Sequence, residues 1–167
     1  RLGRARELLA EAGYGPDRPL RFELRYEPLE ESRRIVVALQ AMWRGIGVDA
    51  QLLHSDFATL HRSVRTGRFD ASRFAWFSPS DDPDTFLGLI ESENPNNHSG
   101  FANGEVDRLI RAASISLDSD ERRRLYLQAE SLALADFPVA PLYFAAYRYL
   151  VAPDIRGFMP NIRGVNA

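Results

Sequence analysis

The chain has 167 residues, of which 45% are hydrophobic and 26% charged, and its formal net charge is −2. This composition excludes global disorder, and the charge balance excludes a general attraction to nucleic acid or to an anionic membrane. Cysteine and lysine are absent, so disulfides, thiolate chemistry and Schiff-base lysines are excluded too. No apolar run approaches the ~18 residues of a membrane span. The length favours one domain over residues 1–167, and a chain that starts at Arg1 suggests a fragment.

The first third of the chain predicts alternating helices and strands. Apolar residues at helical spacing end at Gly13, which indicates a helix. Residues 20–26 alternate between apolar and charged side chains, as a strand with one buried face does. Apolar residues with a 3.6-residue period predict a helix over 30–46, followed by a strand over 48–53. This order predicts a βαβ unit with parallel strands and a right-handed crossover.

The same unit is predicted to repeat. Asp56 is expected to cap a short helix that ends before Gly67, and a strand follows over 69–76. Asp82 and Pro83 then have the residue types of a helix start. An aspartate side chain accepts hydrogen bonds from the free backbone N–H groups, and proline has no N–H group that would need a partner.

The last third begins with a loop over 93–103 that is rich in asparagine and glycine and long enough to serve a function. Helices are predicted over 103–114 and 119–137. Two strands are predicted over 139–144 and 147–151, with prolines at their ends.

The chemistry-bearing residues do not form a recognisable catalytic or metal motif. His54, His61 and His98 lack zinc-binding spacing, so no metal is expected. The acidic residues at 81, 82 and 84 are best explained by helix capping, although calcium binding or a hydrolytic carboxylate pair also uses such residues. There is no nucleophile elbow and no phosphate loop, so no cofactor is expected. The arginines at 62, 65, 68 and 122–124 are expected on solvated helix faces, which argues against nucleic acid.

The segment 73–83 is the best candidate for a binding site. It runs from an aromatic-rich strand into small and acidic residues, and ligands of open α/β sheets bind at the carboxyl ends of strands. Trp76, at the end of that strand, is expected to line the site, whereas Phe74 is expected in the core.

Four segments resemble the bacterial extracellular solute-binding proteins of the oligopeptide/dipeptide (family 5) class. They are ARELLAEAGY at 5–14, FD at 69–70 followed by Trp76 and DP at 82–83, GFANGEVD at 100–107, and PVAPLY at 138–143. The resemblance implies an α/β fold of the type II periplasmic-binding-protein kind, with a mostly parallel sheet and helices on both faces. The chain would be most of the C-terminal lobe of a two-lobed protein whose N-terminal lobe and signal are absent here.

The resemblance also implies a function. Such proteins are not enzymes: they capture an extended peptide or related small solute between two lobes and deliver it to the membrane permease of an ABC importer. They are periplasmic or extracellular and anchored through the N-terminus of the whole protein. An isolated lobe is expected to bind ligand weakly, and its exposed face leaves dimerisation open.

The resemblance implies binding residues at the strand end, and the loop over residues 96–100 is expected to complete the binding surface. Ala75 and Phe77 would pair with the ligand backbone, Trp76 would pack on it, and Arg73 would face its carboxylate. The other expected binding residues are Ser78, Asp81, Asn97 and His98.

One position departs from the family pattern. Peptide-binding members have an aspartate for the peptide ammonium group three residues after the tryptophan, where this chain has Pro79. Either Asp81 replaces it, or the ligands are non-peptide or N-blocked, and we hypothesise the latter. A hydrolase that uses Asp81 with a second carboxylate, and a stand-alone interaction module, are the alternatives in other functional classes.

Overall fold

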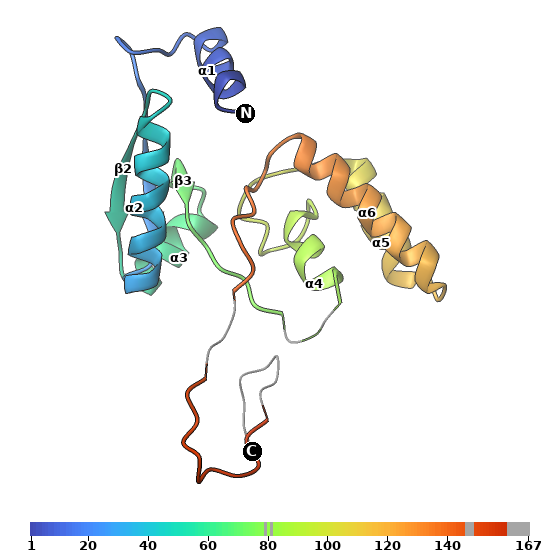
Figure 1. Ribbon diagram of the computed structural model, residues 1–167. Helices are drawn as coiled ribbons and strands as arrows, with labels where there is room; N and C mark the ends of the chain where they lie inside the picture. The colour runs from blue at the N-terminus through green and yellow to red at the C-terminus, as the bar shows by residue number, and fades with distance from the viewer. Residues whose placement is uncertain (79, 81, 146–148, 160–167) are drawn as a thin grey trace. The chain divides into compact units, whose positions relative to one another are not determined.

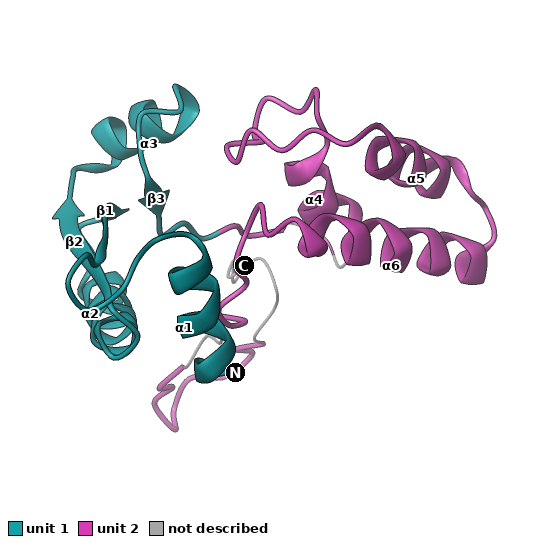
Figure 2. Ribbon diagram, turned by 90° about the horizontal axis from the view of Figure 1, so that it is seen from above, with its two compact units in different colours: residues 1–75 teal, residues 76–167 magenta. Residues whose placement is uncertain are grey.

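The computed structural model describes residues 1–78, 80, 82–145 and 149–159 (Figure 1). The chain divides into two compact units, residues 1–75 and 76–167, and each is described separately (Figure 2). Within the described ranges, no helix is both long enough and apolar enough to span a membrane.

The first unit is built on a three-stranded parallel sheet with the order β2-β1-β3. Strand β1 (Leu20–Tyr26) pairs with β2 (Val48–His54) along its whole length, so that Tyr26 lies opposite His54. The short strand β3 (Ala71–Ser72) pairs with the other side of β1. Helix α2 (Glu30–Arg44) connects β1 to β2, which confirms the predicted βαβ unit.

Helices cover both faces of this sheet, as predicted. On one face α2 packs on β1 and β2, and its Val36 is fully buried against Leu24 and Tyr26. On the other face the Arg25 side chain donates a 3.0 Å hydrogen bond to Ser63 of helix α3 (Phe57–Arg65). Asp56 caps α3 by accepting from the Thr59 backbone N–H at 3.0 Å, as expected. Helix α1 (Leu2–Glu11) precedes the sheet, and the chain leaves it through Gly13 with a φ of +81°.

The strand predicted over 69–76 is much shorter in the structure. The last backbone bond of its ladder is the 2.8 Å bond from the Arg73 N–H to the Arg25 carbonyl. Beyond this point β1 has ended at Tyr26, and Pro28 has no N–H to donate. Phe74, expected in the core, is therefore beyond the sheet: it is 37% exposed and contacts the ring of His61.

The second unit is helical in its described part. Helix α4 (Asp84–Leu87) continues into the 3-10 turn η1 (Gly88–Ile90), and helices α5 (Gly104–Ile115) and α6 (Ser119–Ala135) pack together. This agrees with the three helices predicted here. The side chains of Asn103 and Asp118 cap α5 and α6. The buried core of this unit consists of Ile90, Val106, Leu109, Ile110, Ala113, Leu125, Tyr126, Ala129 and Ala133.

The two strands predicted over 139–144 and 147–151 are not present in the described residues, and 146–148 lie outside them. Phe144 and Leu150 are fully exposed. An apolar alternating segment becomes a strand only when another strand supplies its hydrogen bonds, and none of the described strands does so here.

Candidate functional site

The first unit has a candidate site at the carboxyl ends of its three strands. Tyr26 and His54 end two in-register strands, and Arg73 directly follows the third. Side chains at this edge of a parallel sheet rest on a rigid base and can reach a ligand, because the chain leaves the ladder there.

Arg73 is buried in an ion pair with Glu27. The side chains are 8% and 9% exposed, and an Nη1 atom of Arg73 donates to the Glu27 Oε1 atom. The other carboxylate oxygen of Glu27 is buried, and among the described residues it has no hydrogen-bond partner. Arg73 therefore already has a counter-charge from its own chain, and its expected role toward a ligand carboxylate stays a prediction.

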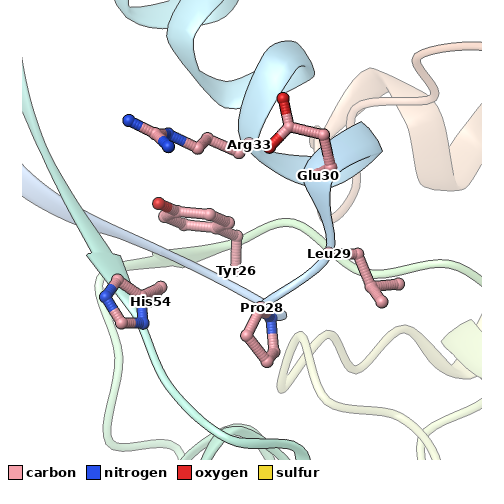
Figure 3. A pocket seen from close by; sticks show the side chains of 6 residues that line it. All are labelled: Tyr26, Pro28, Leu29, Glu30, Arg33 and His54. Carbon is pink, nitrogen blue, oxygen red and sulfur yellow. The ribbon is translucent and has the colours of Figure 1, made fainter.

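A cavity of about 400 Å³ opens where β1 leads into α2, next to the end of β2 (Figure 3). The rings of Tyr26 and His54 meet edge to face there, with 6.2 Å between their centroids. Sequence reasoning missed this cavity, although a tyrosine and a histidine at the ends of successive parallel strands were a readable sign of it. Its lining consists of Tyr26, Pro28, Leu29, Glu30, Arg33 and His54.

Ala75 and Trp76 follow β3 in the chain. Ala75 is half-buried, and within the described chain its N–H and C=O groups have no hydrogen-bond partner. In the second unit, Trp76 and Phe77 are 37% and 59% exposed. The indole is thus accessible at the surface and is not a core residue. Pro79 and Asp81 lie outside the described residues.

Ser78 makes hydrogen bonds to residues just before and within α4. Its hydroxyl accepts hydrogen bonds from the Thr85 hydroxyl at 2.7 Å and from the Ser80 N–H at 3.0 Å, and it donates to the Ser80 carbonyl. These bonds give Ser78 a local structural role, and its contact with ligand stays a prediction.

Asn97 is similarly committed within its own loop. Its amide nitrogen donates to the carbonyls of Glu91 at 3.1 Å and Phe101 at 2.8 Å, while its oxygen accepts from the Ser99 hydroxyl at 2.8 Å. Such a side chain holds the two ends of the loop together. His98, next to it, is half-buried, and its proposed ligand contact also stays a prediction.

The acidic residues that start α4 are held by helix α6. The Asp82 side chain accepts from the Asp84 N–H at 3.0 Å, although the N-cap of α4 is Pro83 and not Asp82 as expected. It also accepts from Arg122 at 2.8 and 2.9 Å, so Arg122, expected on a solvated face, instead forms an ion pair 40 residues away in sequence. The Tyr126 hydroxyl donates to Asp84 at 3.2 Å. Burial raises the pKa of Tyr126, and the Arg122 hydrogen bond opposes that shift.

A second cavity, of about 280 Å³, lies in this unit beside Trp76. Asp84, Glu91 and Asn94 were not among the expected site residues, yet they line it together with Trp76, Phe77 and Asn96 of the expected loop. Among the residues that the structure describes, no group of three or more histidine or acidic side chains is placed to hold a metal ion.

A parallel sheet with helices on both faces, which binds ligands at the carboxyl ends of its strands, is a fold of ligand-binding proteins. Comparison with known proteins agrees with this class. The model of the bacterial extracellular solute-binding proteins, family 5 Middle, matches residues 1–98, and the chain belongs to this family.

Three relatives illustrate the similarity. The periplasmic murein peptide-binding protein MppA of Escherichia coli is 34% identical over 158 residues, which cover 94% of this chain and 29% of that protein. The probable deoxycholate-binding periplasmic protein YgiS of the same organism is 31% identical over 159 residues, covering 95% and 30%. The crystal structure of Haemophilus influenzae OppA in complex with RPPGFSPFR matches with a TM-score of 0.79 at 28% identity. The match covers 82% of this chain and 27% of that protein. The chain thus spans less than a third of the length of these relatives.

Proposed function

We propose that the protein containing this chain is the substrate-binding component of an ABC importer. It captures an extended peptide or related small solute between two lobes and delivers it to a membrane permease. The observation that carries this proposal is the backbone of Ala75, which has no partner within the described chain and stands in sequence between strand β3 and the exposed Trp76. The family match and the names of the relatives support it.

The proposed capture mechanism is addition of a ligand strand. Strand β3 is at the edge of the sheet, and Ala75 after it carries a main-chain donor and acceptor that a ligand backbone can pair with. Main-chain hydrogen bonds do not depend on the ligand's side chains, so they suit a protein that accepts varied cargo. Trp76 would cover the bound backbone with its ring.

The proposal assigns this chain, as a single lobe over residues 1–167, to a protein that acts by binding and release. A periplasmic or extracellular location follows from the same assignment, with an anchor at the N-terminus of the whole protein. Because half of the binding surface would come from the other lobe, the isolated chain is expected to bind ligand with millimolar affinity or not at all, and dimerisation of the isolated chain stays a prediction.

Pro79 bears on the ligand class. Since proline offers neither charge nor side-chain acceptor to an α-ammonium group, we propose non-peptide or N-blocked ligands. Calorimetry of the full-length protein with tri-alanine and with N-acetyl tri-alanine tests this point. Tight binding of the free peptide together with loss of the acetylated one would contradict it.

The role of Trp76 is tested in the same protein with a panel of N-acetylated peptides. Trp76→Ala is expected to weaken binding about tenfold or more, because it removes a large aromatic contact at the centre of the proposed interface. Trp43→Phe is the matched control, since Trp43 packs against Phe22 in the first unit and should not affect affinity. Unchanged affinity in Trp76→Ala would contradict the proposed site.

A further inference from the structure

The cavity beside Trp76 has a chemical character of its own. It lies between the α4 and η1 segment and the loop that follows, and its lining carries two carboxylates, two amides and two aromatic rings. Neither arginine nor histidine is among its described lining residues.

Each carboxylate keeps one oxygen uncommitted. Asp84 accepts one hydrogen bond through Oδ1, from the Tyr126 hydroxyl at 3.2 Å. Glu91 accepts one through Oε1, from the Arg111 Nε at 3.2 Å. Within the described chain the remaining oxygen of each group accepts none. Arg111 is 63% exposed and shares its charge with Asp107 at 3.6 Å, so it screens Glu91 only partly.

The aromatic wall adds a second attraction for positive charge. Trp76 and Phe77 both line the cavity and are both substantially exposed. A cation above the face of such a ring is attracted by its quadrupole, and most strongly so by tryptophan. The rings also offer apolar surface to the stem of a long side chain.

Gly88 makes room for an amide at the cavity. A Cβ atom at this position would lie 3.3 Å from the Asn94 Nδ2 atom, which is tighter than an ordinary contact. The Asn94 oxygen accepts from the Asn96 N–H at 2.9 Å, and this bond fixes the orientation of the amide. Its nitrogen donates no hydrogen bond within the described chain, so it can donate to a carbonyl of a bound molecule.

We infer that this cavity binds a cationic group of the solute, a primary ammonium or a guanidinium on an aliphatic stem. Asp84 and Glu91 neutralise the charge, and Trp76 packs on it. The inference rests on the proposed function and deepens it, because it names a class of ligand. It also identifies a place for a ligand cation in a chain where Pro79 supplies no carboxylate.

The experiment uses calorimetry of the full-length protein with N-acetylated, C-amidated tripeptides. One position at a time is lysine, Nε-acetyl-lysine or norleucine, and the others are alanine. At one of the three peptide positions, the peptide with lysine should bind about tenfold tighter than the peptide with Nε-acetyl-lysine. This difference is expected for a cation with one aromatic and two carboxylate partners. The double variant Asp84→Asn with Glu91→Gln should bring this ratio near one and keep the affinity for the norleucine peptide.

Two further variants keep the test decisive. Glu91→Gln alone should lower the ratio at least threefold, and this single variant replaces the double variant in the test if the double variant does not fold. Glu93→Gln removes a neighbouring acid that does not line the cavity, and it should leave the ratio unchanged. A ratio near one in the wild type overturns the inference. A tenfold ratio that stays unchanged in Glu91→Gln and in the double variant overturns it too. In both cases peptide binding itself upholds the proposed function. Failure of every peptide to bind overturns the inference and restricts the proposed function to non-peptide solutes.

Discussion

The buried pair of Glu27 and Arg73 gives the sharpest test of the fold. Glu27 directly follows β1 and Arg73 directly follows β3, so the pair ties together the ends of two adjacent strands. Glu27→Gln keeps the shape of the side chain but leaves a guanidinium that is only 8% exposed without this counter-charge. Removal of one partner from a buried ion pair typically costs about 3–5 kcal/mol. We therefore expect the free energy of unfolding of the first unit to fall by about 3 kcal/mol.

Urea unfolding followed by tryptophan fluorescence measures this loss. The chain has two tryptophans, one in each unit, so a Trp76→Phe background leaves Trp43 as a reporter of the first unit. With an m-value of about 1.5 kcal/mol per M, a loss of about 3 kcal/mol shifts the midpoint by about 2 M.

An exposed ion pair on the same sheet is the matched control. Arg21 and Asp49 lie 3.3 Å apart with side chains that are 68% and 41% exposed, so Asp49→Asn should cost less than about 1 kcal/mol. Replacing both Glu27 and Arg73 by methionine should recover most of the stability, because no unpaired charge is then buried. If Glu27→Gln costs no more than Asp49→Asn, the reasoning from burial is wrong.

Two further predictions concern the loop and a helix cap. Asn97→Ala leaves two carbonyls without their amide donor, so urea unfolding should show the second unit destabilised by about 1–3 kcal/mol. An equal loss in Asn96→Ala would show that these hydrogen bonds of Asn97 are not the cause. The Thr59 hydrogen bonds lower the pKa of Asp56 below its ordinary value, so the stabilisation from this carboxylate is complete above about pH 4 and is lost as the pH falls through the lowered pKa of the folded state. Thermal unfolding in acid should therefore show a smaller pH dependence for Asp56→Asn than for the wild type; identical profiles would refute the assignment.

The candidate site was predictable only in part. The exposed position of Trp76 followed from its place near the end of an aromatic segment in an α/β pattern. The cavity beside it did not, because Asp84, Glu91 and Asn94 come together through the turn of η1 and the loop after it. Asp84 in sequence was indistinguishable from an ordinary helix-start residue.

The sequence by itself determined the helices, the helix caps and the β1, α2, β2 unit. Their stabilising contacts join residues a few positions apart, so periodicity and capping residues reveal them. Only the tertiary structure decided where β3 stops, that the segments after α6 lack strand partners in the described residues, and that Arg73 pairs with Glu27 and Arg122 with Asp82. These features depend on partners that are distant in the chain, and a strand or a buried charge is stable only when the fold brings such a partner to it.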